Sequence, residues 1–307
     1  MRTVTKKVIR FLVLGLLFFL PRDTKIGVDR WLRGREEYRK LCDADCVVVS
    51  FGKSGRTWVR VLLSRFYQVR HGLAERHLIG FDNLHRKNAG IPKLFFTHDN
   101  YLKDYTKNRA SKADYYQQKV ILLVRDPIDV AVSQFFQWKY RMRRGKKRLN
   151  KYPSHGADMP IYDFVMDLDA GLPKIVEFMN LWAGERPRIK QLLVVRYEDL
   201  RADTEAALKN ILEFIGTPGT VEQIREAVRF SSVENMRKME QKRTFWLAGS
   251  RMVPKDRSNP NSFKVRKAKV GGYRDHFSAQ QIEQIQHLVK AELDPSFHYY
   301  DTAGTNQ

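Results

Sequence analysis

The sequence predicts a single α/β domain in which helices flank a doubly wound, mostly parallel sheet. Three observations support this fold class. Short runs of β-branched and aliphatic residues recur along the chain, most of them precede a segment with helical spacing of apolar residues, and a glycine-bearing loop joins the first such pair. Buried parallel strands have continuous apolar runs, and strands that alternate with helices form parallel sheets.

The elements follow from these runs in chain order. Strands are expected at 46–51, 93–97, 120–124 and 192–195. Helices are expected at 57–69, 203–215, 221–230 and 278–292, with a further one after residue 124 that carries Val130 to Phe136. Residues 104–118 and 238–272 are polar, basic and poorly periodic, so they are expected to be long loops. Loops of that length in a compact domain are usually functional or mobile.

The composition excludes several classes of protein. The chain has 307 residues, of which 43% are hydrophobic, so it is neither disordered nor short of core residues. Two cysteines exclude a disulfide framework. Lys and Arg number 56 against 34 Asp and Glu, which gives a net charge of +22. This charge favours an anionic partner: nucleic acid, a membrane surface, or phosphorylated and sulfated small molecules.

A basic and then apolar N-terminus predicts contact with a membrane. Basic residues at positions 6, 7 and 10 lead into the uncharged run 11–20, which Pro21 ends. A helix over 8–20 would rise about 20 Å, too little for a hydrocarbon core about 30 Å thick. We therefore expect a peripheral or monotopic anchor on the cytoplasmic side of an anionic membrane, with a buried helix or a signal peptide as alternatives. The predicted organisation is a hydrophobic, membrane-associating segment over 1–40 and a functional domain over 41–307.

The loop between the first strand and its helix has the composition of an anion-binding cradle. Its central residues are Lys53, Ser54, Gly55, Arg56, Thr57 and Trp58. Glycine permits a tight backbone, lysine offers a positive charge, and N–H groups at a helix N-terminus bind anions. The end of a Walker A motif is similar, but that motif needs a glycine where Val47 lies inside the strand. A glycine turn with a solvated lysine is the structural alternative.

Four motifs in this order resemble those of the PAPS-dependent sulfotransferases, where PAPS is 3′-phosphoadenosine 5′-phosphosulfate. They are the loop at 53–58, Arg125 at the end of the third strand with Ser133 eight residues later, Tyr197 to Leu200, and the segment Arg266-Lys267-Ala268. The resemblance spans about residues 45–280 and is to the cytosolic-type sulfotransferase domain. It implies a P-loop-like fold, PAPS as cosubstrate, PAP as the desulfated product, and transfer of the sulfuryl group to a hydroxyl acceptor. We expect a bacterial, membrane-associated member of this family.

The resemblance also implies roles for these residues. Lys53 and the loop N–H groups hold the phosphosulfate, and Lys53 compensates the charge that develops on the departing phosphate. Arg125 and Ser133 clamp the 3′-phosphate, over which residues 266–268 close. No metal is expected, because positioning and charge neutralisation accomplish such transfers and no cluster has metal-ligand spacing.

The adenine end of the site departs from the family pattern. Val233 replaces an aromatic residue that commonly stacks on adenine. Trp58 is therefore expected to supply most of the stacking, with Tyr197 and Ser231 at the polar edge of the base.

His98 is expected to be the general base. It follows the second strand, in the position that the family's histidine base occupies between the phosphosulfate loop and Arg125. A neutral imidazole can accept the proton of the acceptor hydroxyl. Asp99 is the second candidate, and a capping or core histidine is the structural alternative. Because Phe96 and Thr97 replace a lysine often found just before the histidine in this family, Arg56 is expected to substitute for that cation.

The acceptor is expected to be a small-molecule or lipid hydroxyl compound, and the apolar N-terminus favours a membrane-associated one. The basic run at 139–151 predicts either a solvated loop or contact with an anionic membrane or acceptor. Nucleic acid is not expected, because this run lacks interleaved aromatic residues for base stacking. Two alternatives remain: a P-loop-type kinase that uses ATP and Mg²⁺, and a non-catalytic membrane- or nucleic-acid-binding module that keeps only the fold.

Overall fold

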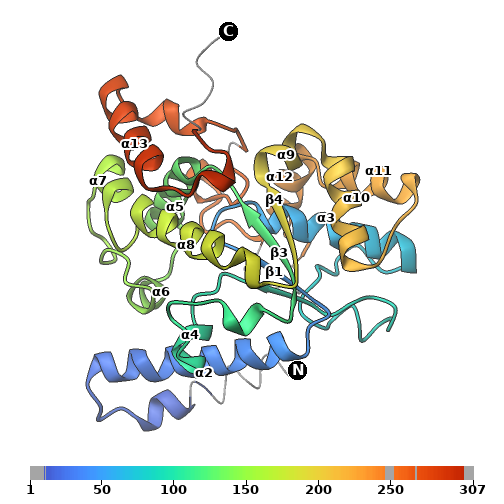
Figure 1. The fold of residues 1–307 in the computed structure, drawn as a ribbon, viewed down its shortest axis with the longest axis horizontal. Coiled ribbons are helices and arrows are strands. Elements are labelled where there is room, and N and C mark those ends of the chain that lie inside the picture. Colours follow the sequence, from blue (N-terminus) through green and yellow to red (C-terminus); the bar gives the residue numbers. More distant parts are fainter. Residues whose placement is uncertain (1–9, 11, 246–251, 267, 301–307) are drawn as a thin grey trace.

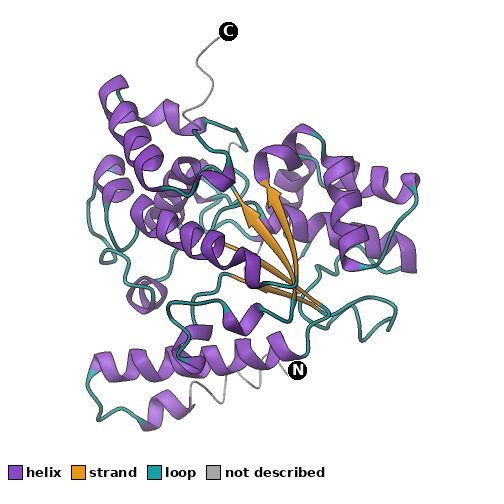
Figure 2. Ribbon diagram, in the orientation of Figure 1, coloured by secondary structure: helices purple, strands orange, loops and turns teal. Residues whose placement is uncertain are grey.

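A four-stranded parallel sheet forms the centre of the protein (Figures 1 and 2). The computed structural model describes residues 10, 12–245, 252–266 and 268–300. The strands are β1 (Cys46–Ser50), β2 (Leu94–Thr97), β3 (Lys119–Val124) and β4 (Gln191–Arg196). Their order is β2-β1-β3-β4, and every neighbouring pair is parallel. All four carboxyl ends therefore meet at one edge, where the loops after the strands can form a site.

Two layers of helices cover the sheet because the side chains of each strand alternate between its faces. Val47 and Val49 of β1 belong to one apolar cluster, whereas Cys46 and Val48 belong to the other. The first cluster packs on α5 (Pro127–Tyr140), α7 (Ile161–Met166), α8 (Leu172–Glu185) and α13 (Ala279–Glu292). The second packs on α3 (Arg56–His71), α10 (Thr204–Ile215) and α11 (Val221–Phe230).

The predicted α/β fold is confirmed, and the four strands lie within two residues of their expected ends. The loop expected at 238–272 is partly wrong. Helix α12 (Val233–Lys242) occupies its first residues. The Ser232 side chain caps this helix by accepting a hydrogen bond from the N–H of Asn235. In addition, the side chains of Met236 and Met239 pack in an apolar cluster with Val61 of α3. Tertiary packing here overrides a polar sequence. Short helices also interrupt two other polar segments: α4 (Leu102–Thr106) and α6 (Arg144–Leu149).

Helix α2 (Arg22–Cys42) crosses the domain boundary that the sequence predicted between residues 40 and 41. It packs on α4, and a side chain at Gly34 would place its Cβ 2.3 Å from the carbonyl oxygen of Tyr101. Arg30 also donates hydrogen bonds to the carbonyls of Asn100 and Leu149, at 2.9 and 2.7 Å. Helix α2 therefore packs against the elements that follow it, and the division expected at residue 40 stays a prediction.

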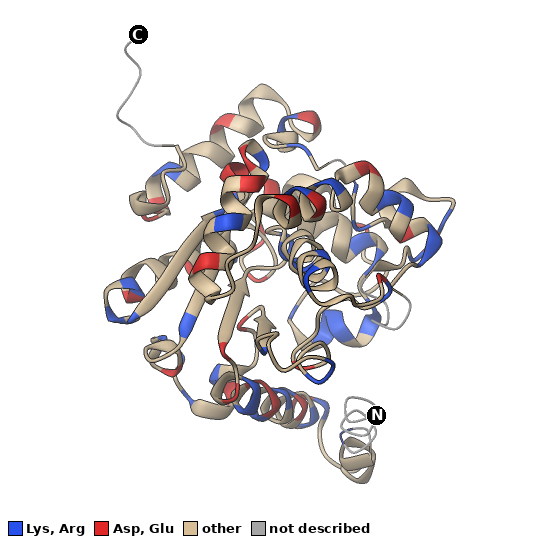
Figure 3. Ribbon diagram, turned by 90° about the vertical axis from the view of Figure 1, so that its right-hand side faces the viewer, with Lys and Arg blue, Asp and Glu red and all other residues tan. Residues whose placement is uncertain are grey.

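The charged side chains of α2 form ion pairs along the helix surface. Figure 3 colours both basic and acidic positions along the helix ribbon. Their side chains form ion pairs one turn apart, such as Arg33 with Asp29 and Lys40 with Glu36. Such pairs stabilise a helix surface by a few tenths of a kcal/mol each. Before α2, the described side chains of the apolar run include exposed Leu16, Phe18 and Phe19. No helix in the described part of the chain is both long and apolar enough to cross a bilayer.

Candidate active site

The loop after β1 forms the floor of the site. Lys53 and Gly55 have positive φ angles of 78° and 94°, which turn the chain sharply before α3 begins at Arg56. A side chain at Gly55 would place its Cβ 2.6 Å from the Tyr197 ring, so glycine is required there by space as well as by backbone conformation. No side chain caps α3, and its N-terminus is therefore available to an anion.

Lys53 lies in this loop among other cations. Its pKa is lowered from the ordinary value of 10.5 to about 7, first by burial and then by the nearby charges of Arg141 and Arg125. An amine with this pKa is ready to take up a proton when a negative group arrives beside it.

His98 follows β2 and faces the loop. Its Nδ1 donates to the carbonyl of Ser50 at 2.8 Å, which leaves the lone pair on Nε2. Arg56 donates to that Nε2 at 2.5 Å. Burial, followed by the charge of Arg56, lowers the pKa of His98 well below 6.5, so the ring is neutral and its basic atom is directed to the site.

Asp99, the second candidate for the base, is engaged elsewhere. One carboxylate oxygen forms an ion pair with Lys112 at 2.6 Å, and the other accepts a hydrogen bond from Tyr115 at 2.8 Å. Both partners are buried. The geometry therefore favours His98 over Asp99 as the proton acceptor.

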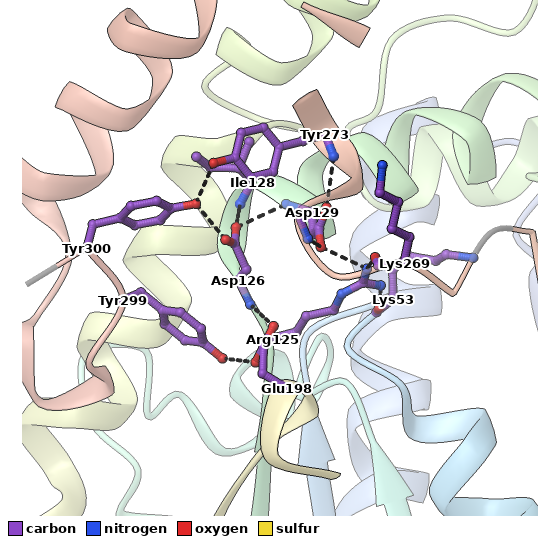
Figure 4. Close-up of polar contacts among 11 residues, drawn as sticks. Lys53, Arg125, Asp126, Ile128, Asp129, Glu198, Lys269, Tyr273, Tyr299 and Tyr300 are labelled. Atoms are coloured by element: carbon purple, nitrogen blue, oxygen red, sulfur yellow. Dashed lines mark hydrogen bonds and ion pairs between the residues drawn. The ribbon is translucent and has the colours of Figure 1, made fainter. Parts of the chain in front are cut away.

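Arg125 directly follows β3 and lies beside Lys53 of the loop after β1 (Figure 4). One of its terminal nitrogens donates to the Asp129 carboxylate at 3.1 Å and to the carbonyl of Lys269 at 3.0 Å. The guanidinium carbon lies 4.4 Å from the centre of the Tyr197 ring. Nε of Arg125 is buried without a hydrogen-bond partner, as is Oγ of Ser231. Buried polar atoms of this kind fit a site that binds a polar ligand.

Asp129 connects this arginine to the loop at 268–273, and sequence reasoning missed it. Its carboxylate accepts from the backbone N–H of Gly271 at 2.9 Å and of Tyr273 at 3.0 Å, in addition to Arg125. The four-residue spacing between Arg125, just before α5, and Asp129, in its first turn, is the signal that could have found the pair. Next to them, Asp126 accepts from the hydroxyl of Tyr300 at 2.5 Å and supports the start of α5.

The predicted adenine residues lie together at the start of α3. Nε1 of Trp58 donates to the carbonyl of Ser231 at 3.0 Å, and its ring packs edge to face on Tyr197 at 5.8 Å. Arg201, which sequence reasoning also missed, lies 5.6 Å from the Trp58 ring centre. Val233 lines the same space.

One cavity of about 960 Å³ joins these parts. The predicted site residues that line it are Lys53, Gly55, Arg56, Thr57, Trp58, His98, Arg125, Ser133, Tyr197, Arg266 and Ala268. Ser54 and Ser231 are buried and do not line it, and Lys267 lies outside the described residues. Within the described residues there is no group of three His, Cys, Asp or Glu side chains that could hold a metal ion.

Comparison with known proteins identifies the family. The family model for the sulfotransferase domain matches residues 43–297. The chain belongs to the sulfotransferase family. Cytosolic sulfotransferase 14 of Arabidopsis thaliana is 26% identical over 295 residues, which cover 84% of this chain and 77% of that protein. The activity of this sulfotransferase is transfer of a sulfuryl group from PAPS.

Solved structures agree on the fold of this sulfotransferase. Mouse sulfotransferase SULT7A1, solved with PAP, gives a TM-score of 0.56 at 20% identity and covers 84% of this chain and 89% of its own. Retinol dehydratase, solved with retinol and PAP, gives a TM-score of 0.54 at 19% identity, and the match covers 85% of this chain and 83% of retinol dehydratase. The bacterial origin expected from the sequence stays a prediction.

Proposed function

We propose that the sulfotransferase binds PAPS between the loop at 53–58 and Arg125, with the acceptor hydroxyl directed to His98. One observation carries this assignment: the anion-binding loop, the phosphate arginine and the neutral histidine line the same cavity. An in-line displacement needs these groups on opposite sides of the transferred sulfur.

The reaction proposed for this site needs a base and charge compensation. The acceptor oxygen forms a bond to sulfur, the bond from sulfur to the bridging phosphate oxygen breaks, and the hydroxyl proton goes to Nε2 of His98. Lys53 and the N-terminus of α3 neutralise the charge that remains on the departing phosphate of PAP. Arg56 is proposed to leave His98 and contact the sulfuryl group, since it already reaches the base at 2.5 Å.

At the nucleotide end, Arg125 and Ser133 are proposed to hold the 3′-phosphate. Both residues line the cavity, and Nε of Arg125, which has no hydrogen-bond partner, can donate to a phosphate oxygen. Arg266, whose guanidinium lies 3.8 Å from the ring centre of Phe136, and Ala268 belong to the segment that closes over this phosphate. Trp58 is proposed to stack on adenine.

The experiment that tests this function is thermal unfolding with PAP and, separately, with ATP and Mg²⁺. A ligand that binds the native state raises the apparent Tm by mass action. We expect PAP to raise Tm in the wild type and to do so far less in Arg125→Ala, while Arg225→Ala, which removes an exposed arginine outside the cavity, behaves as wild type. A rise in Tm with ATP and Mg²⁺ but not with PAP would instead indicate a kinase. If neither ligand raised Tm, the protein would be a non-catalytic module.

The acceptor is proposed to be a hydroxyl compound at a membrane, which the enzyme contacts from the cytoplasmic side through residues 8–20. Support comes from Leu16, Phe18 and Phe19, which are 73%, 79% and 68% exposed. Clustered exposed apolar side chains mark interaction surfaces.

A sedimentation assay with phosphatidylglycerol vesicles tests this contact. We expect wild type to sediment with the vesicles, and the triple variant Leu16→Ser, Phe18→Ser and Phe19→Ser to stay largely in the supernatant. Leu168→Ser is the matched control, because Leu168 is equally exposed, at 79%, but lies between α7 and α8. Equal sedimentation of the triple variant would remove the proposed contact.

A further inference from the structure

The part of the cavity beyond His98 is lined by cations from several elements. They include Lys103 of α4, Arg143 and Lys146 at α6, and Lys151 after it. Figure 1 shows α4 lying against α2. Helix α2 in turn contacts β2, the edge strand of the sheet. Lys146 is close enough to His98 for its charge to lower the pKa of that ring. These cations therefore surround the place where an acceptor hydroxyl must lie.

The carboxylates of this region form no close ion pair with these four cations, although the charges of Glu37 and Asp29 act on Lys146. Asp169 and Glu177 also line the cavity, where basic side chains outnumber acidic ones. Asp104 pairs with Arg30 at 2.9 Å and with Arg109 at 3.8 Å, and Asp99 pairs with Lys112. Among the residues that the structure describes, no carboxylate lies within 4.0 Å of the charged nitrogens of the four: Lys103, Arg143, Lys146 and Lys151. The ammonium nitrogen of Lys146 lies 5.9 Å from the centre of the Tyr101 ring.

The cosubstrate does not account for this charge. Its phosphate and phosphosulfate groups are proposed to meet Lys53, Arg125 and Arg266, which line the other part of the cavity. Gathering further like charges in one cleft costs free energy unless an anion enters it. Apolar side chains are also present, since Phe51 and Phe178 line the cavity and pack edge to face at 5.5 Å.

We propose that the acceptor is itself an anion: a hydroxyl compound carrying a phosphate group, which Arg143 and Lys146 bind while the hydroxyl faces His98. The inference rests on the proposed function and names the substrate class for the same site. The phosphate belongs either to a soluble organic phosphate or to a lipid headgroup. Phe51 and Phe178 contact the carbon part of either compound.

Phosphate binding to the protein saturated with PAP tests this inference without knowledge of the natural acceptor. Inorganic phosphate is titrated into wild type and into the double variant Arg143→Gln/Lys146→Gln, with Tm as the readout. The matched control is Arg225→Gln/Lys209→Gln, which removes the same charge from exposed ion pairs outside the cavity. One charge pair near a protein surface changes affinity about fivefold, so we expect the apparent phosphate Kd to rise at least about tenfold in the cavity variant alone.

Two results separate failure of this inference from failure of the proposed function. If PAP raises Tm in both variants but phosphate binds them equally well, the anionic acceptor is wrong and the PAPS site stands. If PAP fails to raise the Tm of the wild type, the proposed function itself fails.

Transfer of labelled sulfuryl from PAPS then identifies the source of the phosphate. Glycerol phosphate and phosphatidylglycerol vesicles are the anionic acceptors, and diacylglycerol in phosphatidylcholine vesicles is the uncharged one. Label in glycerol phosphate indicates a soluble acceptor, and label in phosphatidylglycerol a headgroup; in either case the cavity variant should raise KM more than it lowers kcat. Preferential labelling of diacylglycerol would overturn the proposal.

Discussion

His98→Ala is expected to lower kcat for sulfuryl transfer by about 10²- to 10⁴-fold, while PAP still raises Tm as in the wild type. The imidazole is held by the carbonyl of Ser50 at 2.8 Å, so Nε2 is the atom that can accept a proton. The substitution removes this acceptor but leaves Arg125 and the loop at 53–58 in place. His287→Ala, on the exposed face of α13, is the matched control and should retain full activity.

The pH profile provides an independent readout of the same residue. Burial and the Arg56 charge lower the pKa of His98 well below 6.5, so the neutral, active form persists as the pH falls through that value. The wild-type kcat, measured at saturating PAPS, is therefore expected to stay level from about pH 8 to about pH 6. Arg56→Thr removes one of the charges that lower the pKa of His98, so this pKa should rise. As the pH is lowered, the variant should therefore lose activity at a higher pH than the wild type does. Turnover retained in His98→Ala would remove His98 from the mechanism.

Lys53→Met is expected to lower kcat by about 10²- to 10³-fold, the effect of removing one group that stabilises developing charge. Methionine keeps the approximate length of the side chain without its charge. Lys209→Met, on the exposed surface of α10, loses the same charge and should behave as wild type. Equal kcat in Lys53→Met and wild type would show that other groups neutralise the charge that develops on the departing phosphate.

Lys53 should also couple nucleotide binding to proton uptake. Its pKa of about 7 in the ligand-free protein lies below the ordinary 10.5, so the amine is mostly neutral at higher pH. Phosphate groups beside it favour the charged form and raise the pKa, so PAP binding takes up a proton above about pH 7 and weakens as the pH rises. Below that pH the amine is already charged and no uptake is expected. Calorimetry in Hepes and Tris measures the proton number, which should vanish in Lys53→Met.

Local patterns in the sequence were enough to predict the sheet. The run Cys46-Val-Val-Val-Ser50 is apolar on both faces, as a central parallel strand requires, and it forms β1 between β2 and β3. The position of the loop at 53–58 was also predictable from local sequence, because its glycine and lysine lie directly between a strand pattern and a helix pattern. The prediction of a loop at 238–272 failed at α12, where packing decided the structure.

The sequence by itself determined the fold class, the sulfotransferase motifs and the candidate base, since each depends on residues close together in the chain. Only the tertiary structure decided how these parts act on one another. Arg56 contacts His98 across 42 positions of sequence. Asp129, which pairs with Arg125, accepts a hydrogen bond from Gly271 across 142 positions. The cations around the acceptor space likewise come from separate elements. Spacing along a chain encodes the period of a helix or strand, whereas contacts between distant segments exist only once the helices pack on the sheet.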